Sequence, residues 1–142
     1  MDYSVGPISR DKGFKERRWA VLGQTYVPLH VTEHSASLHA TMPPGTFVPM
    51  HLHHGQDEML FLIEGELEFD LDGQVFKAGA GTQVTLPREV PHAFYNKSDR
   101  DAVVLVTVSP PRQFFELMDS ISGVPEPAEV GRLGGEHNVP FL

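Results

Sequence analysis

Short apolar runs, several of them alternating with polar residues, follow one another along the first 110 residues. They fall at 17–22, 24–31, 36–42, 46–53, 58–71, 74–78, 82–87, 92–96 and 102–109. Most are rich in β-branched or aromatic residues, and turn-forming residues separate them, which is typical of β-strands. Asp72-Gly73 lies between two runs and predicts a tight hairpin turn. The pattern predicts an all-β sandwich or barrel of eight or nine strands, because no helical segment separates them as in a parallel α/β fold.

The chain changes character after residue 110. Four apolar residues recur there at roughly helical spacing, directly after two prolines that suit a helix start: Phe114, Phe115, Met118 and Ile121. A second short helix over 127–138 is weakened by three glycines. We expect one domain with an N-terminal arm at 1–16, a barrel at 17–110 and a helical tail at 111–142 packed on the barrel. The first helix is expected to cover an open end of the barrel as core, with a substrate lid as the alternative.

Composition and charge narrow the functional classes. The 142 residues suffice for one domain with a core, and 40% of them are hydrophobic. The formal charge of −8 argues against a nucleic acid or an anionic membrane as partner, because both attract basic surfaces. There is no cysteine, which excludes disulfides, zinc-thiolate sites and thiol nucleophiles. We expect a cytoplasmic protein, because the first residues lack a secretory signal and no apolar run approaches the ~18 residues that span a bilayer.

A cluster of histidines beside a glutamate carries the candidate chemistry. His51 and His53 are two residues apart on an expected strand, so their side chains point to one face, whereas His54 is expected in the following turn. The chain then re-enters a strand at Glu58, and His92 opens a later strand. Three imidazoles and one carboxylate that converge inside a barrel would form a site for a divalent metal with open coordination positions. A hydrogen-bonded polar cluster without a metal is the alternative.

The spacing of these residues is specific. The pattern G-x5-H-x-H-x4-E-x6-G, from Gly45 to Gly65, is far rarer by chance than its histidine and glutamate part alone. It resembles the first motif of the cupin superfamily at every defining position, and residues 81–96, GTQVTLPREVPHAFYN, resemble the second motif. Glu89 departs from that second motif, which usually has glycine there. A glutamate is strained at this position if the turn needs a positive φ.

This resemblance implies a fold, a ligand set and a mechanism. It implies a small jelly-roll β-barrel that forms a homodimer. It also implies that one divalent transition metal per chain (Fe, Mn, Ni, Co, Cu or Zn) is bound by His51, His53, Glu58 and His92. The flanking segments 17–29 and 109–121 resemble single-domain cupins of the quercetin 2,3-dioxygenase-like group. In that group the resemblance implies that Glu58 is catalytic and accepts a proton from the substrate.

The function expected on these grounds is that of a metal-dependent dioxygenase, which acts with O2 on a small aromatic, enol or diol substrate. Two alternatives stay open: a redox-neutral isomerase, lyase or decarboxylase, and a small-molecule-binding barrel without catalysis. Four apolar residues near the expected ligands are candidates for a substrate pocket or for plain core: Phe47, Leu60, Leu62 and Phe94. The inward strand positions offer Leu, Phe and Val rather than Lys or Arg, which favours an apolar substrate over a sugar or an acid.

Overall fold

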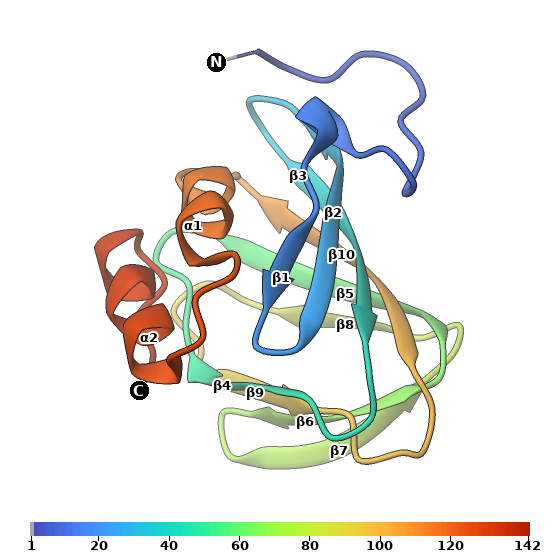
Figure 1. Ribbon diagram of the computed structural model, residues 1–142. Coiled ribbons are helices and arrows are strands. Elements are labelled where there is room, and N and C mark those ends of the chain that lie inside the picture. Colours follow the sequence, from blue (N-terminus) through green and yellow to red (C-terminus); the bar gives the residue numbers. More distant parts are fainter. Residues whose placement is uncertain (1) are drawn as a thin grey trace.

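The computed structural model describes residues 2–142, which form ten strands in two antiparallel sheets (Figure 1). The larger sheet has the order β1-β2-β3-β10-β5-β8, with bounds Trp19–Val21, Gln24–Val31, Ala36–Met42, Ala102–Ser109, Asp57–Glu64 and Gln83–Leu86. The smaller sheet has the order β4-β9-β6-β7, with bounds Phe47–His51, His92–Tyr95, Glu66–Leu71 and Gln74–Gly79. Strands distant in sequence pair in both sheets, as in a jelly roll. The predicted all-β jelly-roll barrel is confirmed.

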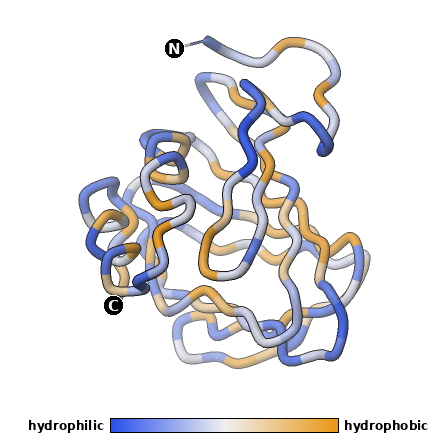
Figure 2. The backbone as a smooth tube through the Cα atoms, viewed as in Figure 1, coloured by the Kyte–Doolittle hydropathy of each residue, from blue (hydrophilic) through white to orange (hydrophobic). Residues whose placement is uncertain are grey.

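The barrel forms because its strands are apolar on one face. In β3 the side chains of Leu38, Ala40 and Met42 are almost completely buried, whereas Ser37 and His39 between them are only half-buried. The same alternation runs through all eight residues of β10. Figure 2 shows hydrophobic positions recurring along the strands of both sheets. The inward side chains of the two sheets meet in one core, where each buried leucine contributes about 1.5–3 kcal/mol to folding.

The turns between strands confirm one expectation and correct another. Asp72 and Gly73 join β6 to β7 as predicted, and their φ angles of 51° and 87° are those that a type I′ turn requires. The apolar run 58–71 is not one strand, because it breaks at Gly65 into β5 and β6, which belong to different sheets. Gly65 has a φ of 74°, and a Cβ there would lie 2.5 Å from Asp101 O. Only glycine permits this corner.

The tail, residues 111–142, forms two helices that lie beside one end of the barrel (Figure 1). They are α1 (Phe114–Ile121), which contacts β1, and α2 (Pro127–Glu136), which contacts α1. The buried face of α1 consists of Phe114, Leu117, Met118 and Ile121. Before β1 comes a short 3-10 helix, η1 (Phe14–Glu16). Within residues 2–142 none of these helices has the length and hydrophobicity needed to cross a bilayer.

Candidate metal centre

Four polar side chains meet inside the barrel. His51 ends β4 and His53 follows two residues later, while His92 begins β9 and pairs with His51 across the two strands. Glu58 is the second residue of β5, in the other sheet. All four side chains are buried, with exposed fractions of 5% or less. The residues that the two motifs single out therefore lie at one point, although they come from three strands and a loop.

The potential ligand atoms of this cluster are close to one another. One atom from each residue can be chosen so that all four lie within 4.8 Å of one another. His92 Nε2 lies 3.1 Å from Glu58 Oε1, and His53 Nε2 lies 3.4 Å from the same oxygen. The ring centroids of His51 and His92 are 4.4 Å apart. The cluster is thus compact enough for a single ion.

Hydrogen bonds determine which nitrogen of each ring faces the cluster. His51 Nδ1 lies 2.7 Å from Pro49 O, and His92 Nδ1 lies 3.1 Å from Val90 O. Because a carbonyl oxygen only accepts, each Nδ1 carries the hydrogen and donates it. In the neutral ring Nε2 then keeps a free lone pair, as a metal ligand requires.

Gln56 orients the third histidine in the same way. Its side-chain nitrogen donates to Pro110 O at 2.9 Å and to Pro111 O at 2.8 Å, so its oxygen is left to accept from His53 Nδ1 at 2.7 Å. Gln56 is itself buried. His53 Nε2 therefore also faces Glu58 with a lone pair. Within residues 2–142 it is the one buried side-chain polar atom that has no hydrogen-bond partner.

Burial and mutual proximity shift the pKa values of these groups. Burial, reinforced by His92 and His53, lowers the pKa of His51 to about 3. Burial alone would raise the pKa of Glu58, but His53 and His92 hold it well below its ordinary value. Burial lowers the pKa of His53, yet the charge of Glu58 outweighs this effect and the net shift is upward. The cluster therefore holds an ionised carboxylate that needs positive charge beside it.

These residues fit a divalent metal ion. Three imidazole lone pairs and one carboxylate face one another in a buried space, an arrangement that is unfavourable unless a cation or protons lie between them. Among the described residues, no Lys or Arg lines the cavity beside them and could supply that charge. Histidine nitrogens with one carboxylate oxygen suit borderline transition metals. The buried cluster is compatible with one metal ion, and the orphaned Nε2 of His53 is the atom that such an ion would satisfy.

Glu89 joins the loop that contains His53 to the loop that precedes His92. Its φ of 66° lies in the left-handed region, which glycine adopts readily but which is strained for glutamate. Its backbone N–H donates to His53 O at 3.0 Å, and its carboxylate accepts from Gly55 N at 2.7 Å and lies 2.7 Å from His54 Nδ1. The side-chain contacts compensate for the strain that the sequence predicted. His54 is the turn residue that we expected, and it contacts Glu89 rather than the cluster.

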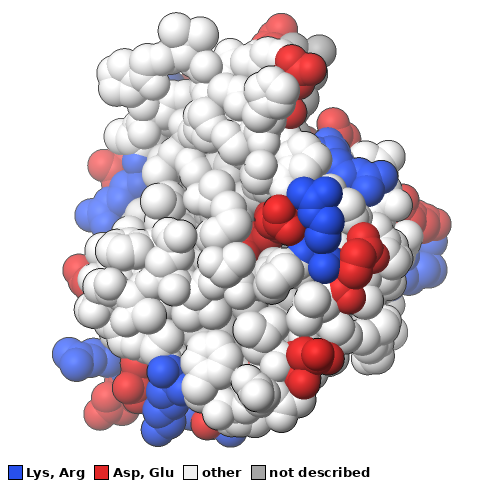
Figure 3. Space-filling model, turned by 180° about the vertical axis from the view of Figure 1, so that it is seen from behind, with Lys and Arg blue, Asp and Glu red and all other residues white. Residues whose placement is uncertain are grey.

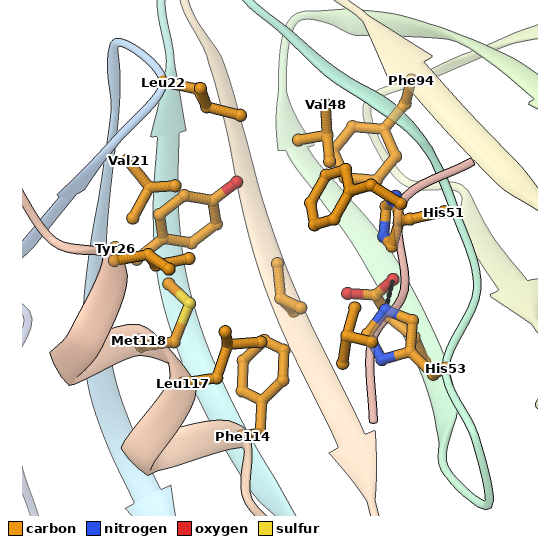
Figure 4. Close-up of a pocket in the computed structure, with 15 residues that line it drawn as sticks. Val21, Leu22, Tyr26, Val48, His51, His53, Phe94, Phe114, Leu117 and Met118 are labelled. Carbon is orange, nitrogen blue, oxygen red and sulfur yellow. Dashed lines mark ion pairs between the residues drawn. The ribbon is translucent and has the colours of Figure 1, made fainter. Parts of the chain in front are cut away.

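The cluster faces a narrow, mostly apolar cavity of about 60 Å³ (Figure 4). A water molecule takes up about 30 Å³ of liquid and a cavity of about 150 Å³ holds a benzene ring, so this space suits a few small molecules and must widen to admit an aromatic ring. The C-terminal residues cover one side of it. Phe141 stacks on His51 with ring centroids 5.0 Å apart, and Leu52 N donates to Pro140 O at 3.1 Å. This segment separates the cluster from solvent.

Of the four residues predicted for a substrate pocket, the structure places one in this cavity, namely Phe94. Leu60 and Leu62 share the face of Glu58 but lie deeper in the barrel, where they are completely buried in the core. Phe47 is 47% exposed and lines a separate surface groove instead. Strand alternation gave the correct side of the sheet for both leucines, but not how far along the barrel they lie.

Other residues of the cavity wall were not singled out by the sequence. Phe114 and Met118 of α1, which were assigned to the core, line the cavity (Figure 4). Tyr26 also lines it, and its signal was present, because alternation in β2 turns Gln24 and Tyr26 inward as polar residues on a buried face. Phe141 had no such signal, since no periodic pattern extends to the end of the chain.

Comparison with known proteins places this arrangement in a family. The profile of the Cupin domain family, Cupin_2, matches residues 38–108, half of the chain, and this range includes all four cluster residues. The chain belongs to the cupin superfamily. Polyketide synthase CurC of Streptomyces cyaneus is 35% identical over 71 residues, which cover 50% of this cupin and 46% of that protein. Quercetin 2,3-dioxygenase of Bacillus subtilis (strain 168) is 30% identical over 64 residues, 45% of this cupin and 19% of that protein.

The cupin thus aligns with less than half the length of each of these relatives. Among solved structures it is similar to an RmlC-like cupin from Shewanella frigidimarina NCIMB 400, with a TM-score of 0.71 and 19% identity over 81% of this chain and 99% of that one. It is also similar to KdgF from Halomonas sp., with a TM-score of 0.64 and 19% identity over 71% and 93% of the two chains. At this identity the two structures establish the fold alone.

Proposed function

We propose that this cupin is a metal-dependent dioxygenase for a small aromatic, enol or diol substrate, with His51, His53, Glu58 and His92 binding one divalent transition metal per chain. One observation carries the proposal: three oriented imidazoles and a carboxylate converge on a small apolar cavity. The similarity to a protein named quercetin 2,3-dioxygenase supports oxygen chemistry over the alternatives. Iron, manganese, nickel, cobalt, copper and zinc all suit this ligand set.

The residues of the chain have separate tasks in this proposal. When bound, the metal supplies a Lewis-acidic centre that favours the deprotonated form of a phenol or enol. Glu58, whose low pKa keeps it ionised at neutral pH, accepts the proton that the substrate hydroxyl loses. Phe141 and the apolar wall exclude bulk water, which would otherwise compete with the substrate for the open positions.

The volume of the cavity limits the substrate. About 60 Å³ is less than the ~150 Å³ that encloses a benzene ring, so even one ring enters only if α1 or the segment 138–142 moves. A flavonol has three rings and would need a much larger movement. We therefore propose a one-ring substrate, which needs the smallest widening of the cavity.

Redox-neutral chemistry on a sugar or acid is the weaker candidate. Such substrates are usually held by Lys or Arg, and no residue of either type among those described lines the cavity. The two arginines near the rim have other partners. Arg88 pairs with Asp57 at 3.1 Å, and Arg112 donates to His54 O at 2.7 Å. The apolar wall favours an aromatic ring.

Oxygen uptake tests the proposed activity. The protein is reconstituted with each candidate metal and incubated with one-ring catechols, enols and, for comparison, flavonols. We expect oxygen consumption with at least one redox-active metal, and we expect Glu58→Gln to keep part of its metal but lose turnover. No oxygen consumption in any combination would contradict the dioxygenase and favour redox-neutral chemistry or plain binding. A fully active Glu58→Gln variant would remove Glu58 from the mechanism.

We also propose that the homodimer implied by the sequence forms through the outer face of the larger sheet. Phe61 and Ile63 of β5 are 38% and 44% exposed there, beside the outward Leu105 of β10. The side of the molecule opposite to that of Figure 1 has a broad area without Lys, Arg, Asp or Glu, with groups of charged side chains around it (Figure 3), and an apolar surface of this kind is typical of an interface. Analytical ultracentrifugation should give a dimer that Phe61→Lys disrupts and Val75→Lys, on the smaller sheet, does not. A monomeric parent would contradict this.

A further inference from the structure

A chain of hydrogen bonds ends at the cavity wall across from the cluster. The side chain of Tyr26 points into the cavity from β2, facing His51 and His53 (Figure 4). Tyr26 Oη lies 2.5 Å from Gln24 Oε1, and Gln24 Nε2 lies 3.2 Å from Thr46 Oγ1. Thr46 Oγ1 lies 2.8 Å from Pro43 O. Apart from the cluster itself, Tyr26 is the one residue with a polar side chain among the described residues that line the cavity.

The direction of each hydrogen bond in this series follows from the last acceptor, the carbonyl oxygen of Pro43. Pro43 O is a carbonyl oxygen and can only accept, so the Thr46 hydroxyl donates its single hydrogen to it. Thr46 Oγ1 can then only accept from Gln24, which turns the Gln24 side-chain nitrogen toward it and the oxygen toward Tyr26. The Tyr26 hydroxyl in turn must donate to Gln24 Oε1. Gln24 is 1% exposed, so water does not offer an alternative partner.

The Tyr26 oxygen therefore presents lone pairs, and no hydrogen, to the cavity. Within residues 2–142 no side chain or backbone group donates a hydrogen bond to it. Burial, with a smaller contribution from the charge of Glu58, raises the pKa of Tyr26, so the hydroxyl keeps its hydrogen at neutral pH and the directions above hold. A buried acceptor in an otherwise apolar wall is satisfied by a water molecule or by a ligand that brings a donor and displaces that water.

We propose that Tyr26 is a specificity-determining residue, which accepts a hydrogen bond from a second hydroxyl of the substrate, at the end of the ring remote from the cluster. The inference rests on the proposed function for the near end of the substrate, and it names the substrate class as a one-ring diphenol or hydroxy-enol. Ether and carbonyl analogues would place an acceptor against the Tyr26 lone pairs, which leaves both oxygens unpaired. Sites that read a ligand hydroxyl in this way discriminate more strongly than apolar pockets do.

Ligand binding without turnover tests this inference. The zinc-loaded protein and the metal-free protein are titrated by calorimetry, without oxygen, with catechol, resorcinol and hydroquinone and with the monomethyl ether of each. We expect at least one diphenol to bind about tenfold more tightly than its ether, as one hydrogen bond allows. Tyr26→Phe should bring that ratio close to one. Gln24→Met removes the acceptor that holds the Tyr26 hydrogen, so the ether should bind more tightly to this variant than to the parent.

Each outcome is decisive. The inference is overturned if no diphenol binds, if diphenols and ethers bind equally well, or if neither variant changes the ratio. Should Tyr26→Phe fail to fold, Gln24→Met alone decides: tighter binding of the ether supports the inference, and unchanged binding overturns it. The metal centre is tested separately. If the parent takes up no zinc, the proposed metal centre fails. The inference on Tyr26 still stands in that case if the metal-free protein prefers the diphenol to its ether and loses this preference in Tyr26→Phe.

Discussion

Replacing Gln56 with methionine removes the support behind His53 at nearly constant side-chain length. Gln56 accepts from His53 Nδ1 and donates to Pro110 O and Pro111 O, at distances of 2.7, 2.9 and 2.8 Å. Methionine fills the same space without an amide. The substitution therefore leaves one ring N–H and two backbone carbonyls without partners, and it frees the His53 ring to rotate.

The expected magnitude follows from those three groups. A buried polar group that loses its partner costs about 1–3 kcal/mol. Pro110 and Pro111 are only half-buried, so water can replace the lost donors there, whereas His53 is 2% exposed. We therefore expect the free energy of unfolding of the metal-free protein to fall by about 2–4 kcal/mol in urea. We also expect zinc affinity, measured by competition with a chromogenic chelator, to fall about 10–100-fold, as is typical when the partner of a ligating histidine is lost.

Gln56→Glu is the matched control. Its carboxylate still accepts from His53 Nδ1, but it cannot donate to Pro110 O or Pro111 O. This variant should lose at least as much stability as Gln56→Met while its zinc affinity stays within about fivefold of the parent, because the ring keeps its orienting acceptor. A methionine variant that binds zinc as tightly as the parent would refute the role assigned to Gln56.

Two further predictions concern the C-terminal cover and the pH dependence. Gly134→Ala should destabilise the protein by about 1–3 kcal/mol, because a Cβ there would lie 2.5 Å from Val139 O. Gly135→Ala is the matched control, since its Cβ meets open space and should stabilise α2 by about 0.5–1 kcal/mol. Equal melting temperatures of the two variants would contradict this prediction. The metal-free protein should be most stable near pH 6.5, the ordinary pKa of histidine. Below that pH, His51 binds a proton in the unfolded chain but not in the folded one, where its pKa is lowered to about 3, so stability falls as the pH falls. Above that pH, His53 keeps a proton in the folded protein, where its pKa is raised, but releases it in the unfolded chain, so stability falls as the pH rises. Urea unfolding across pH checks the maximum, and stability that rises steadily to alkaline pH would rule it out.

The sequence was informative where the determining interactions are local. Strand alternation and turn residues predicted the barrel, since a period of two and the Asp72-Gly73 hairpin depend on neighbours in the chain. The spacing of His51, His53 and Glu58 works in the same way, because a strand, a short turn and a return strand carry these side chains to one place.

Features set by long-range packing were not predictable in this way. At the corner at Gly65 the backbone of Asp101 approaches closely, and this contact joins the end of β5 to the start of β10, which is distant in the sequence. The depth of Leu60 below the cluster depends on how the barrel closes rather than on alternation. Phe141 reaches His51 only because α2 directs the end of the chain back along β4, and no pattern in the sequence marks that path.

Metal content tests the proposed metal centre most directly. Elemental mass spectrometry is performed on protein purified without an affinity tag, with His53→Ala purified in parallel. We expect about one transition metal per chain in the parent and its loss in the variant. A parent that holds no metal even after reconstitution would contradict the proposed metal centre, and would leave His51, His53, Glu58 and His92 as a polar cluster in a binding barrel.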